Sequence, residues 1–334
     1  MRYVKPIKFK SLTLPSNVFY SPLAGCSDFP FRQMAALYPV GLMYCEMVKM
    51  DALIRHEPNT YHILDYRDSM RPIGAQLCGS KTELAGPTAR IIEDLGFDVV
   101  DLNCGCPVDK VTKDGSGSGM LKNPHLIGDV IANMVAAVSI PVTVKIRAGW
   151  DQDSLNAPEI TRIAEAAGAT AIAIHGRTRV QKYTGKADWD IIRACKEVAQ
   201  SIHVIGNGDV FSAQDGLALF EHSGCDAILA SRGTMGQPWI AEDVKRFDNG
   251  EALLEVNGEM IRDHLLKHIS YIRLYQTERK AILDTRRVGC WFLRIGKGTK
   301  KLREQINRSK SMEEMVALIE DYDWSQTREF SYAS

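Results

Sequence analysis

The amino-acid sequence predicts an α/β fold: a (β/α)8 TIM barrel followed by a smaller all-helical C-terminal domain. Three observations favour this fold. Strand-like runs alternate with helical patterns as far as about residue 231, polar residues gather at the ends of those runs, and strand-like runs are missing after about residue 240. The chain has 334 residues, enough for one large domain and one small one.

Eight short runs rich in β-branched and other apolar residues are candidate strands. They cover residues 18–23, 42–46, 72–77, 98–103, 141–147, 170–175, 202–207 and 226–231. Most are separated by segments whose apolar residues recur at i, i+3 and i+4, often closed by a glycine. Alternating strands and helices require parallel pairing through right-handed crossovers. Eight such units in about 240 residues match the usual size of a (β/α)8 barrel, and a doubly wound open sheet is the alternative.

Polar residues follow seven of the eight runs, where a barrel enzyme places its active site. Any one of them could be an ordinary loop residue or helix cap. Their agreement across seven strands favours a functional site at one end of the barrel. The residues are Glu46, Gln76, Asn103, Lys145 with Arg147, His175, Asn207 and Arg232.

The C-terminal part of the chain is helical in pattern and basic in charge. We place the domain boundary between residues 1–244 and 245–334, and we expect helices without strands in the second part. Residues 267–310 hold 13 Lys and Arg against three acidic residues, although the whole chain is neutral. This asymmetry favours a polyanionic partner, with nucleic acid ahead of membrane because no strongly apolar helical face accompanies the charge. A solvated helix face is the alternative.

Composition indicates a reducing compartment. The N-terminal residues form no signal peptide, and no apolar stretch approaches the length of a membrane span, so we expect a cytoplasmic protein with no membrane partner. Eight cysteines are then more compatible with buried, catalytic or metal-binding roles than with disulfides.

Two glycine-containing loops resemble a phosphate seat. Residues 207–212 and 231–240 follow the last two predicted strands, where barrels commonly bind phosphate through backbone N–H groups. Gly208 and Gly233 allow close backbone approach, and Arg232 adds a positive charge. The glycine-rich stretch 114–119 lacks the lysine of a P-loop, so we expect it to be a flexible loop over the barrel mouth.

Lys145 lies in a run otherwise suited to the barrel interior. A buried ammonium group needs an anionic or electron-rich partner, and a flavin would serve because its reduced ring carries negative charge near N1. Gln76 and Asn103 could add amide contacts to the flavin or the substrate. The alternative is a lysine that extends out of the barrel end.

Residues 101–110, DLNCGCPVDK, place Cys104 and Cys106 one residue apart at the end of a predicted strand. We disfavour a metal site because the spacing is not that of a zinc knuckle and no second pair lies at ligand spacing. A cysteine thiol is ordinarily protonated at neutral pH, since its pKa is about 8.5. A thiol facing a flavin could therefore donate a proton as a general acid.

Seven segments, in order along the chain, resemble the flavin-dependent tRNA-dihydrouridine synthases, and most closely their B-type branch. The resemblance extends from about residue 17 to the early 300s. The segments are SPLAGCSDFPFR, GAQLCGS, DLNCGCPVDKVTKDGSGSGMLKNP, PVTVKIRAGWD, AIAIHGRT, IGNGDV and SRGTMGQPWI. The chain departs from the family pattern at Leu23, commonly methionine, and at Ser231, commonly glycine. It also lacks a histidine often found just upstream of Trp291.

This resemblance implies an FMN-containing barrel and a helical tRNA-binding domain. NADPH would reduce FMN, flavin N5 would give a hydride to uracil C6, and Cys106 would protonate C5, with Cys104 a bystander. FMN would contact Pro22, Leu23, Ala24, Gln76, Lys145, His175, Asn207, Gly208, Asp209, Ser231 and Arg232. Asn103 would hold the target uracil, while substrate RNA would face Arg177, Thr178, Lys182 and Tyr183.

Two other functions remain open on sequence grounds. One is an FMN oxidoreductase that acts on a free pyrimidine or another small molecule, with the helical domain used for oligomerisation. The other is an RNA-binding module whose barrel has lost its chemistry. We expect a monomer with no metal, and the uridine that is modified depends on how the helical domain orients the tRNA.

Overall fold

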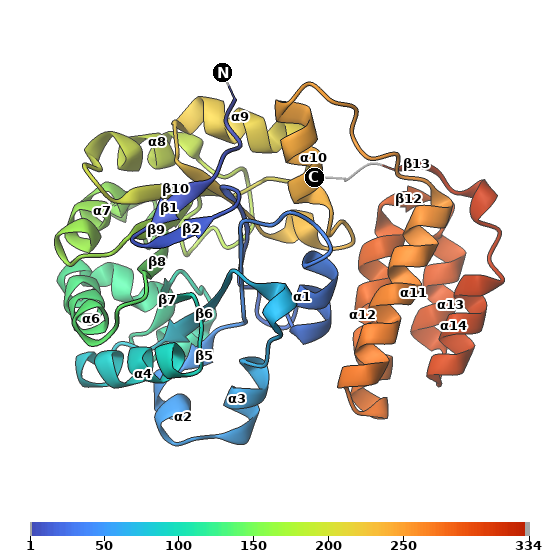
Figure 1. Ribbon diagram of the computed structural model, residues 1–334, viewed down its shortest axis with the longest axis horizontal. Coiled ribbons are helices and arrows are strands. Elements are labelled where there is room, and N and C mark those ends of the chain that lie inside the picture. Colours follow the sequence, from blue (N-terminus) through green and yellow to red (C-terminus); the bar gives the residue numbers. More distant parts are fainter. Residues whose placement is uncertain (1, 331–334) are drawn as a thin grey trace.

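The computed structural model describes residues 2–330 and has two parts side by side (Figure 1). A parallel barrel ringed by helices occupies the N-terminal part of the chain. Four helices of the C-terminal part, two of them long, stand against one flank of the barrel. The predicted fold class, a (β/α)8 barrel followed by a helical domain, is confirmed.

Eight parallel strands form the closed barrel. Each lies within or beside one of the eight predicted runs, and the ring closes where β11 pairs with β3 and β4 pairs with β6. A further two-residue strand, β5 (Val48–Lys49), pairs with the end of β6. The eight strands are β3 (Val18–Tyr20), β4 (Leu42–Tyr44), β6 (Ile73–Cys78), β7 (Val99–Cys104), β8 (Val142–Arg147), β9 (Ala171–His175), β10 (His203–Asn207) and β11 (Ala227–Ala230).

Helices cover the outside of the barrel, as the apolar periodicity between the strands predicts. Local residues set their ends: α9 begins at a capping box made by Ser212 and Asp215 and ends at Gly224, whose φ of 65° is left-handed. The helices are α1 (Phe29–Ala35), α2 (Met50–Ile54), α3 (Pro58–Ile63), α4 (Thr82–Asp94), α5 (Asp109–Thr112), α6 (Pro124–Ala137), α7 (Ala157–Ala166), α8 (Trp189–Val198), α9 (Ala213–Ser223) and α10 (Ile240–Asp248).

An N-terminal hairpin closes the bottom of the barrel. Strands β1 (Ile7–Phe9) and β2 (Leu12–Leu14) pair antiparallel, and their buried Phe9 and Leu14 join an apolar cluster inside the barrel with Phe19. Sequence reasoning missed this hairpin because each strand has only three residues. Because the bottom is filled, a ligand can enter only at the C-terminal ends of the strands.

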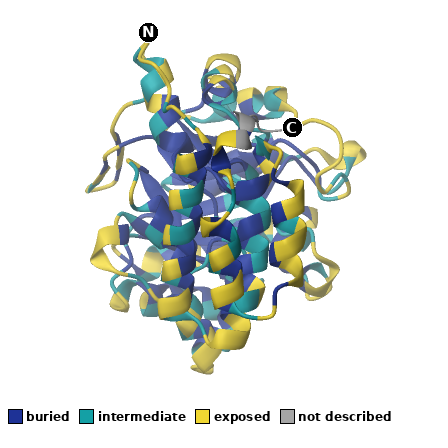
Figure 2. Cartoon of the chain, turned by 90° about the vertical axis from the view of Figure 1, so that its right-hand side faces the viewer, coloured by how far each residue is buried: buried dark blue, intermediate teal, exposed yellow. Residues whose placement is uncertain are grey.

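The helical part contains α11 (Gly258–Tyr275), α12 (Glu278–Arg294), α13 (Lys300–Arg308) and α14 (Met312–Glu320). The apolar faces of these four helices share a core separate from that of the barrel. Their exposed residues lie on the faces turned away from this core (Figure 2). The expectation of helices without strands is wrong here. Two short strands, β12 (Gly296–Lys297) and β13 (Arg328–Phe330), pair antiparallel and bring the end of the described chain back to α12.

Aromatic stacking and ion pairing hold the helical part against the barrel. The Tyr275 ring stacks on Phe29 of α1 at 4.3 Å between ring centres, and its hydroxyl donates to Asp65 at 2.8 Å. Arg287 of α12 pairs with Asp28 at 3.0 Å. Because Asp28 caps α1, the Arg287 ion pair links α12 to the first βα loop of the barrel, while Tyr275 anchors the end of α11.

The predicted domain boundary at residues 244 and 245 falls inside α10. This helix packs against α9, and its Val244 belongs to the barrel core, so the last helix of the barrel ring ends at Asp248. The division of the chain into two folding units stays a prediction. Within residues 2–330, no helix combines the length and apolar character needed to cross a bilayer.

Candidate active site

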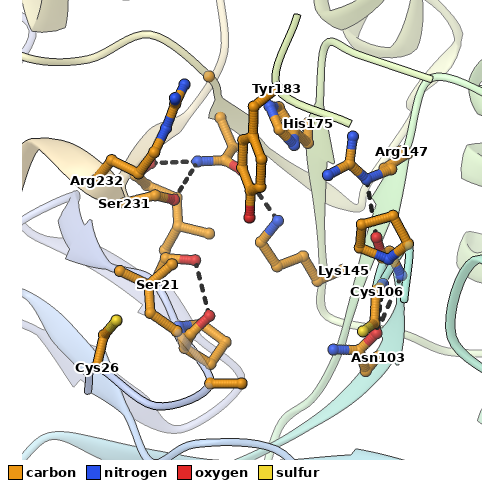
Figure 3. Close-up of a pocket in the computed structure, with 18 of the residues that line it drawn as sticks. Ser21, Cys26, Asn103, Cys106, Lys145, Arg147, His175, Tyr183, Ser231 and Arg232 are labelled. Carbon is orange, nitrogen blue, oxygen red and sulfur yellow. Dashed lines mark hydrogen bonds between the residues drawn. The ribbon is translucent and has the colours of Figure 1, made fainter. Parts of the chain in front are cut away.

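A cavity of about 430 Å³ opens at the C-terminal ends of the barrel strands (Figure 3). Its size is typical of small-molecule sites. It brings together all eleven residues predicted to contact FMN, together with the predicted acid Cys106, Asn103, which is predicted to hold the target uracil, and Tyr183, which is predicted to face substrate RNA. The eleven are Pro22, Leu23, Ala24, Gln76, Lys145, His175, Asn207, Gly208, Asp209, Ser231 and Arg232.

The two neighbouring cysteines have different surroundings. Cys104 is the last residue of β7, fully buried, with its Sγ 3.7 Å from the sulfur of Met120, and burial raises its pKa well above the usual value. Cys106 lies in the loop beyond the strand, is only partly buried, and lines the cavity. Of these two cysteines, only Cys106 is therefore placed to exchange a proton with a ligand in the cavity.

The loop that carries Cys106 is held by hydrogen bonds on both sides. Asn103 Oδ1 accepts from the backbone N–H of Gly105 at 3.1 Å and of Cys106 at 2.9 Å. Ser118 Oγ donates to the Cys106 carbonyl at 2.8 Å, and Arg147 Nε donates to the Gly105 carbonyl at 2.9 Å. These bonds fix the position of the Cys106 backbone.

The glycine-rich stretch 114–119 does not line the cavity, contrary to the expectation of a loop over the barrel mouth. Ser118 is fully buried beneath the cysteine loop. Gly117 has a φ of 58°, and a Cβ there would lie 3.0 Å from the Cys106 carbonyl oxygen. Glycine is needed at this position because the two loops pack too closely for a side chain.

Lys145 projects from β8 into the cavity and donates to Asn207 Oδ1 at 2.9 Å. Asn207 in turn donates to the Ser231 hydroxyl at 2.9 Å and to the Leu229 carbonyl at 2.6 Å, so its amide oxygen is turned toward the lysine. Burial, and then the charge of Arg147, lower the pKa of Lys145 to about 8. A bound anion would restore its charge, which makes this position suited to an anionic ligand.

His175 is buried at the end of β9 and is neutral. Burial, together with the surrounding positive charges of Lys145, Arg147, Arg177 and Arg232, holds its pKa well below the usual range. Arg177 Nη1 lies 3.4 Å from His175 Nε2. Because a guanidinium group only donates, His175 Nε2 is the acceptor and the proton is on Nδ1.

Asp209 joins the loops after β9, β10 and β11. Its carboxylate accepts from Arg177 at 2.8 Å, from the backbone N–H of Ala187 at 2.7 Å and from Arg232 at 3.3 Å. Asp209 has a φ of 57°, and Gly208 before it has a φ of 127°. A Cβ on Gly208 would meet Ala187 at 2.6 Å, so the close approach of these loops requires glycine.

Arg232 and Tyr183 form one wall of the cavity (Figure 3). The Arg232 guanidinium carbon lies 4.7 Å from the centre of the Tyr183 ring and 5.2 Å from that of Phe211. Tyr183 is 53% exposed, so its ring is available to a large ligand at the mouth. The Ser231 hydroxyl accepts a hydrogen bond from Asn207 inside the cavity.

Three residues predicted to face RNA do not line the cavity. Arg177 and Thr178 are buried, and Arg177 is paired with Asp209, so both support the loop after β9. Lys182 is exposed, and its carbonyl accepts from Arg147 at 2.9 Å. Glu46, which follows a strand as predicted, accepts from the backbone N–H of Gly25 and also lies outside the cavity lining.

Sequence reasoning missed several wall residues because they are apolar or small. Phe211 and Met235 come from the loops after β10 and β11, and Met47 and Cys26 from the loops after β4 and β3. Their only signal is their position a few residues beyond a strand end. In residues 2–330, no three His, Cys, Asp or Glu side chains are grouped as metal ligands.

Comparison with known proteins identifies the family. The dihydrouridine synthase family model matches residues 19–327. A tRNA-dihydrouridine synthase B of Pseudomonas aeruginosa is 32% identical over 317 residues, 95% of each chain. A probable tRNA-dihydrouridine synthase of Rhizobium leguminosarum is 39% identical over 283 residues, 84% of this chain and 86% of the relative.

Solved structures with the same barrel fold include a dehydrogenase and a reductase of low sequence identity. Histamine dehydrogenase from Rhizobium matches with a TM-score of 0.56 and 13% identity over 79% of this chain and 51% of that chain. Morphinone reductase in complex with tetrahydroNAD matches with a TM-score of 0.54 and 14% identity, over 76% of this chain and 92% of that one. These two structures support the fold alone. The match to the family model and the full-length relatives show more: the chain belongs to the dihydrouridine synthase family, as its motifs predict, and relatives named as B-type members match it over nearly their whole length.

Proposed function

We propose that this protein reduces specific uridines in tRNA to 5,6-dihydrouridine, with FMN as cofactor and NADPH as reductant. The observation that carries the proposal is that Cys106, Asn103 and all eleven predicted flavin contacts line one cavity at the barrel mouth. Relatives that match nearly the full chain are named tRNA-dihydrouridine synthases, which supports the same substrate and product.

The cavity suits an anionic, planar cofactor. Lys145, with its pKa lowered to about 8, would pair with the electron-rich edge of the flavin ring. The remaining N–H group of Gln76 would donate to a carbonyl oxygen of the flavin ring. Backbone groups near Gly208, with the Arg232 guanidinium beside them, would hold the phosphate group.

In the reaction, bound FMN reduced by NADPH would supply the hydride that uracil C6 receives. Cys106 would break its S–H bond and give the proton to C5, so that the C5–C6 double bond becomes single. Asn103 would hold the uracil edge, and neutral His175 would add no further charge beside Lys145. The fixed backbone of the cysteine loop would keep the thiol on the side of the base opposite the hydride donor.

A uridine within folded tRNA must leave its stack to reach this cavity, at a cost of a few kcal/mol. The basic helical part would offset this cost through phosphate contacts. Trp291 of α12 packs its backbone against Gly236, so the C-terminal half of α12 lies beside the loop that carries Arg232. Beyond this point, the exposed side chains of Arg294, Lys300 and Lys301 add positive charge to the surface of the helical part. We expect the protein to act as a monomer in the cytoplasm.

Deletion of the gene tests the proposal directly. We expect dihydrouridine to disappear from at least one tRNA position in deleted cells, mapped by sequencing that detects the saturated base. Purified protein should be yellow and should restore the base to that tRNA with NADPH. A map unchanged at every position would reject the proposal, as would turnover of free uridine that tRNA does not increase.

A further inference from the structure

A buried chain of hydrogen bonds connects Asp101 to the backbone of Cys106. Gln76 Nε2 donates to Asp101 Oδ2 at 2.7 Å, and Asn103 Nδ2 donates to Gln76 Oε1 at 2.7 Å. Asn103 Oδ1 then accepts from the Cys106 N–H at 2.9 Å. Asp101 is 3% exposed and Gln76 is 1% exposed, so the bond between them is shielded from bulk water.

Strand register produces this chain. Gln76 of β6 stands directly opposite Asp101 of β7, and Asp101 stands opposite Thr143 of β8. Asn103 is two residues beyond Asp101 on the same strand and therefore projects from the same face into the barrel. Thr143 Oγ1 donates to Asp101 Oδ1 at 2.6 Å from β8, on the side of Asp101 away from Gln76.

The negative charge on Asp101 determines the orientation of the side-chain amides of Gln76 and Asn103. A carboxylate can only accept, so Gln76 must present its NH₂ group to Asp101 and its oxygen to Asn103. Asn103 must then donate to Gln76, which leaves its own oxygen for the Cys106 N–H. If both amides were reversed, the NH₂ group of Asn103 would face the N–H of Cys106, and two donors would oppose each other in a buried site.

We propose that Asp101 is a positioning residue, whose fixed negative charge orders the Gln76 and Asn103 amides and thereby anchors the loop that carries Cys106. The inference rests on the proposed function for the task of Cys106, while the anchoring itself is a property of the folded chain. Lys145 offsets the buried charge of Asp101, since it projects from the same face of β8 as Thr143.

The same orientation of the Gln76 and Asn103 amides determines which hydrogen-bonding groups face the cavity at this point. Asn103 Oδ1 already accepts from the N–H groups of Gly105 and Cys106, so the Asn103 side chain can offer a ligand only its second N–H, which lies 3.5 Å from the sulfur of Met47. Such a donor favours carbonyl oxygens. A uracil O4 would be accepted there, whereas the amino group at the same position of cytosine would meet a second donor.

The test moves the negative charge from position 101 to position 76 with substitutions that hardly change the shape of either side chain. In Asp101→Asn, the new amide can lie either way round, so the anchor at Cys106 weakens. In the double variant D101N Q76E, a carboxylate at position 76 accepts from both position 101 and Asn103, which restores the original orientation of Asn103. The matched control is Thr143→Val, which removes a bond to Asp101 on the side away from Gln76. It is measured at about pH 8, because loss of this bond raises the Asp101 pKa and the carboxylate must keep its charge.

Backbone hydrogen exchange at Cys106, resolved by mass spectrometry of purified protein, reports the anchor without any assay of activity. We expect about tenfold faster exchange in D101N and in Q76E, because a charge-assisted bond is lost in each. Exchange should return to within about twofold of the native rate in D101N Q76E and should stay native in T143V. Native exchange in D101N, or no recovery in the double variant, overturns the inference.

A second measurement separates this inference from the proposed function. In D101N, dihydrouridine formation should fall about tenfold while reduction of the bound flavin by NADPH stays within about twofold. If native protein forms no dihydrouridine at all, the proposed function fails while the exchange data still decide the anchoring. Equal loss of both steps in D101N, with native exchange at Cys106, would assign Asp101 to the flavin instead.

Discussion

Cys104 and Cys106 are separated by one glycine, yet Cys104 Sγ packs 3.7 Å from the sulfur of Met120 in the core and Cys106 lines the cavity. The strand ends at Cys104, so Cys106 is free of the strand's alternation and turns toward the ligand space. Substitution of Cys104 and substitution of Cys106 should therefore have different effects.

Replacement of Cys106 by alanine should abolish uridine reduction and spare flavin reduction. Loss of a general acid costs about a hundredfold or more in rate. The variant should still bind FMN and oxidise NADPH in a stopped-flow assay. The control, Cys104→Ala, should keep tRNA activity within about threefold and lose about 1 kcal/mol of stability, because it removes a buried sulfur. Equal loss of activity in both variants would contradict the assignment.

Binding of FMN should be accompanied by uptake of a proton near pH 8. Lys145 has a pKa of about 8 because it is buried near Arg147, so about half of it is neutral at that pH. An anionic flavin beside it would raise this pKa and recharge the amine. Calorimetry of flavin binding in buffers of different ionisation enthalpy measures the uptake, which Lys145→Met should remove. The same uptake in the variant would show that another group takes up the proton.

Acid should impair uridine reduction before it affects folding. Burial raises the pKa of Asp101 to about 6, against the attraction of Lys145 on β8 and with the Tyr44 hydroxyl on β4 nearby. Protonation removes the charge that orders the amides, so the rate should fall as pH drops through about 6. A raised pKa means that the folded protein binds this proton more tightly than the unfolded chain, so the protonation does not itself destabilise the fold.

Steady-state rates between pH 5 and pH 8, with a thermal melt at each pH, check this prediction. D101N should lack the acid limb that the native enzyme shows near pH 6. If the limb persists unchanged in D101N, another group controls it.

The fold should lose stability as pH falls below about 6.5, and His268 should account for part of the loss. Its two ring nitrogens have no hydrogen-bond partner in the described part of the chain, and burial lowers its pKa to about 3. The unfolded chain takes up a proton near pH 6.5 while the folded chain does not. Linkage then removes about 2 kcal/mol of stability between pH 7 and pH 5.

Chemical denaturation of His268→Leu at those two pH values measures this share. The variant should be at least as stable as the native protein at pH 7, because an unpartnered buried polar group is removed. The free energy of unfolding of the variant should fall less between pH 7 and pH 5. The pH dependence that remains is due in part to His175 and His264, whose pKa values are also lowered by burial. An unchanged slope would contradict the assignment to His268.

Removal of two exposed lysines on α13 should weaken tRNA binding in a salt-dependent way. Lys300 and Lys301 are exposed, while Leu302 of the same helix is buried in the helical core. Each lost phosphate contact lowers the slope of log K against log salt by about 0.9, so K300A K301A should reduce it by up to about 2. The control, K8A K10A, removes two exposed lysines from the hairpin at the closed end of the barrel. Equal weakening by both pairs would place the RNA elsewhere.

The sequence by itself determined the barrel and most of its site. Strands and helices can be read from the sequence because the two-residue and 3.6-residue periods of apolar residues are local patterns. All strands of a parallel barrel have their C-terminal ends on the same side, so Gln76, Asn103, Lys145 and His175 could be predicted to lie together. Seven ordered motifs were enough to predict the family. The short N-terminal hairpin and the β12–β13 pair escaped because strands of two or three residues show no period.

Only the tertiary structure decided what each polar side chain faces. Arg177 and Thr178 follow a strand as Arg232 does, but they turn into the protein to support Asp209 and its loop. Asp101 looks in the sequence like one polar residue within a buried strand, and register alone sets it between Gln76 and Thr143. The physical reason is that hydrogen-bond order in a buried network depends on partners from several strands, and no local pattern records which of them meet.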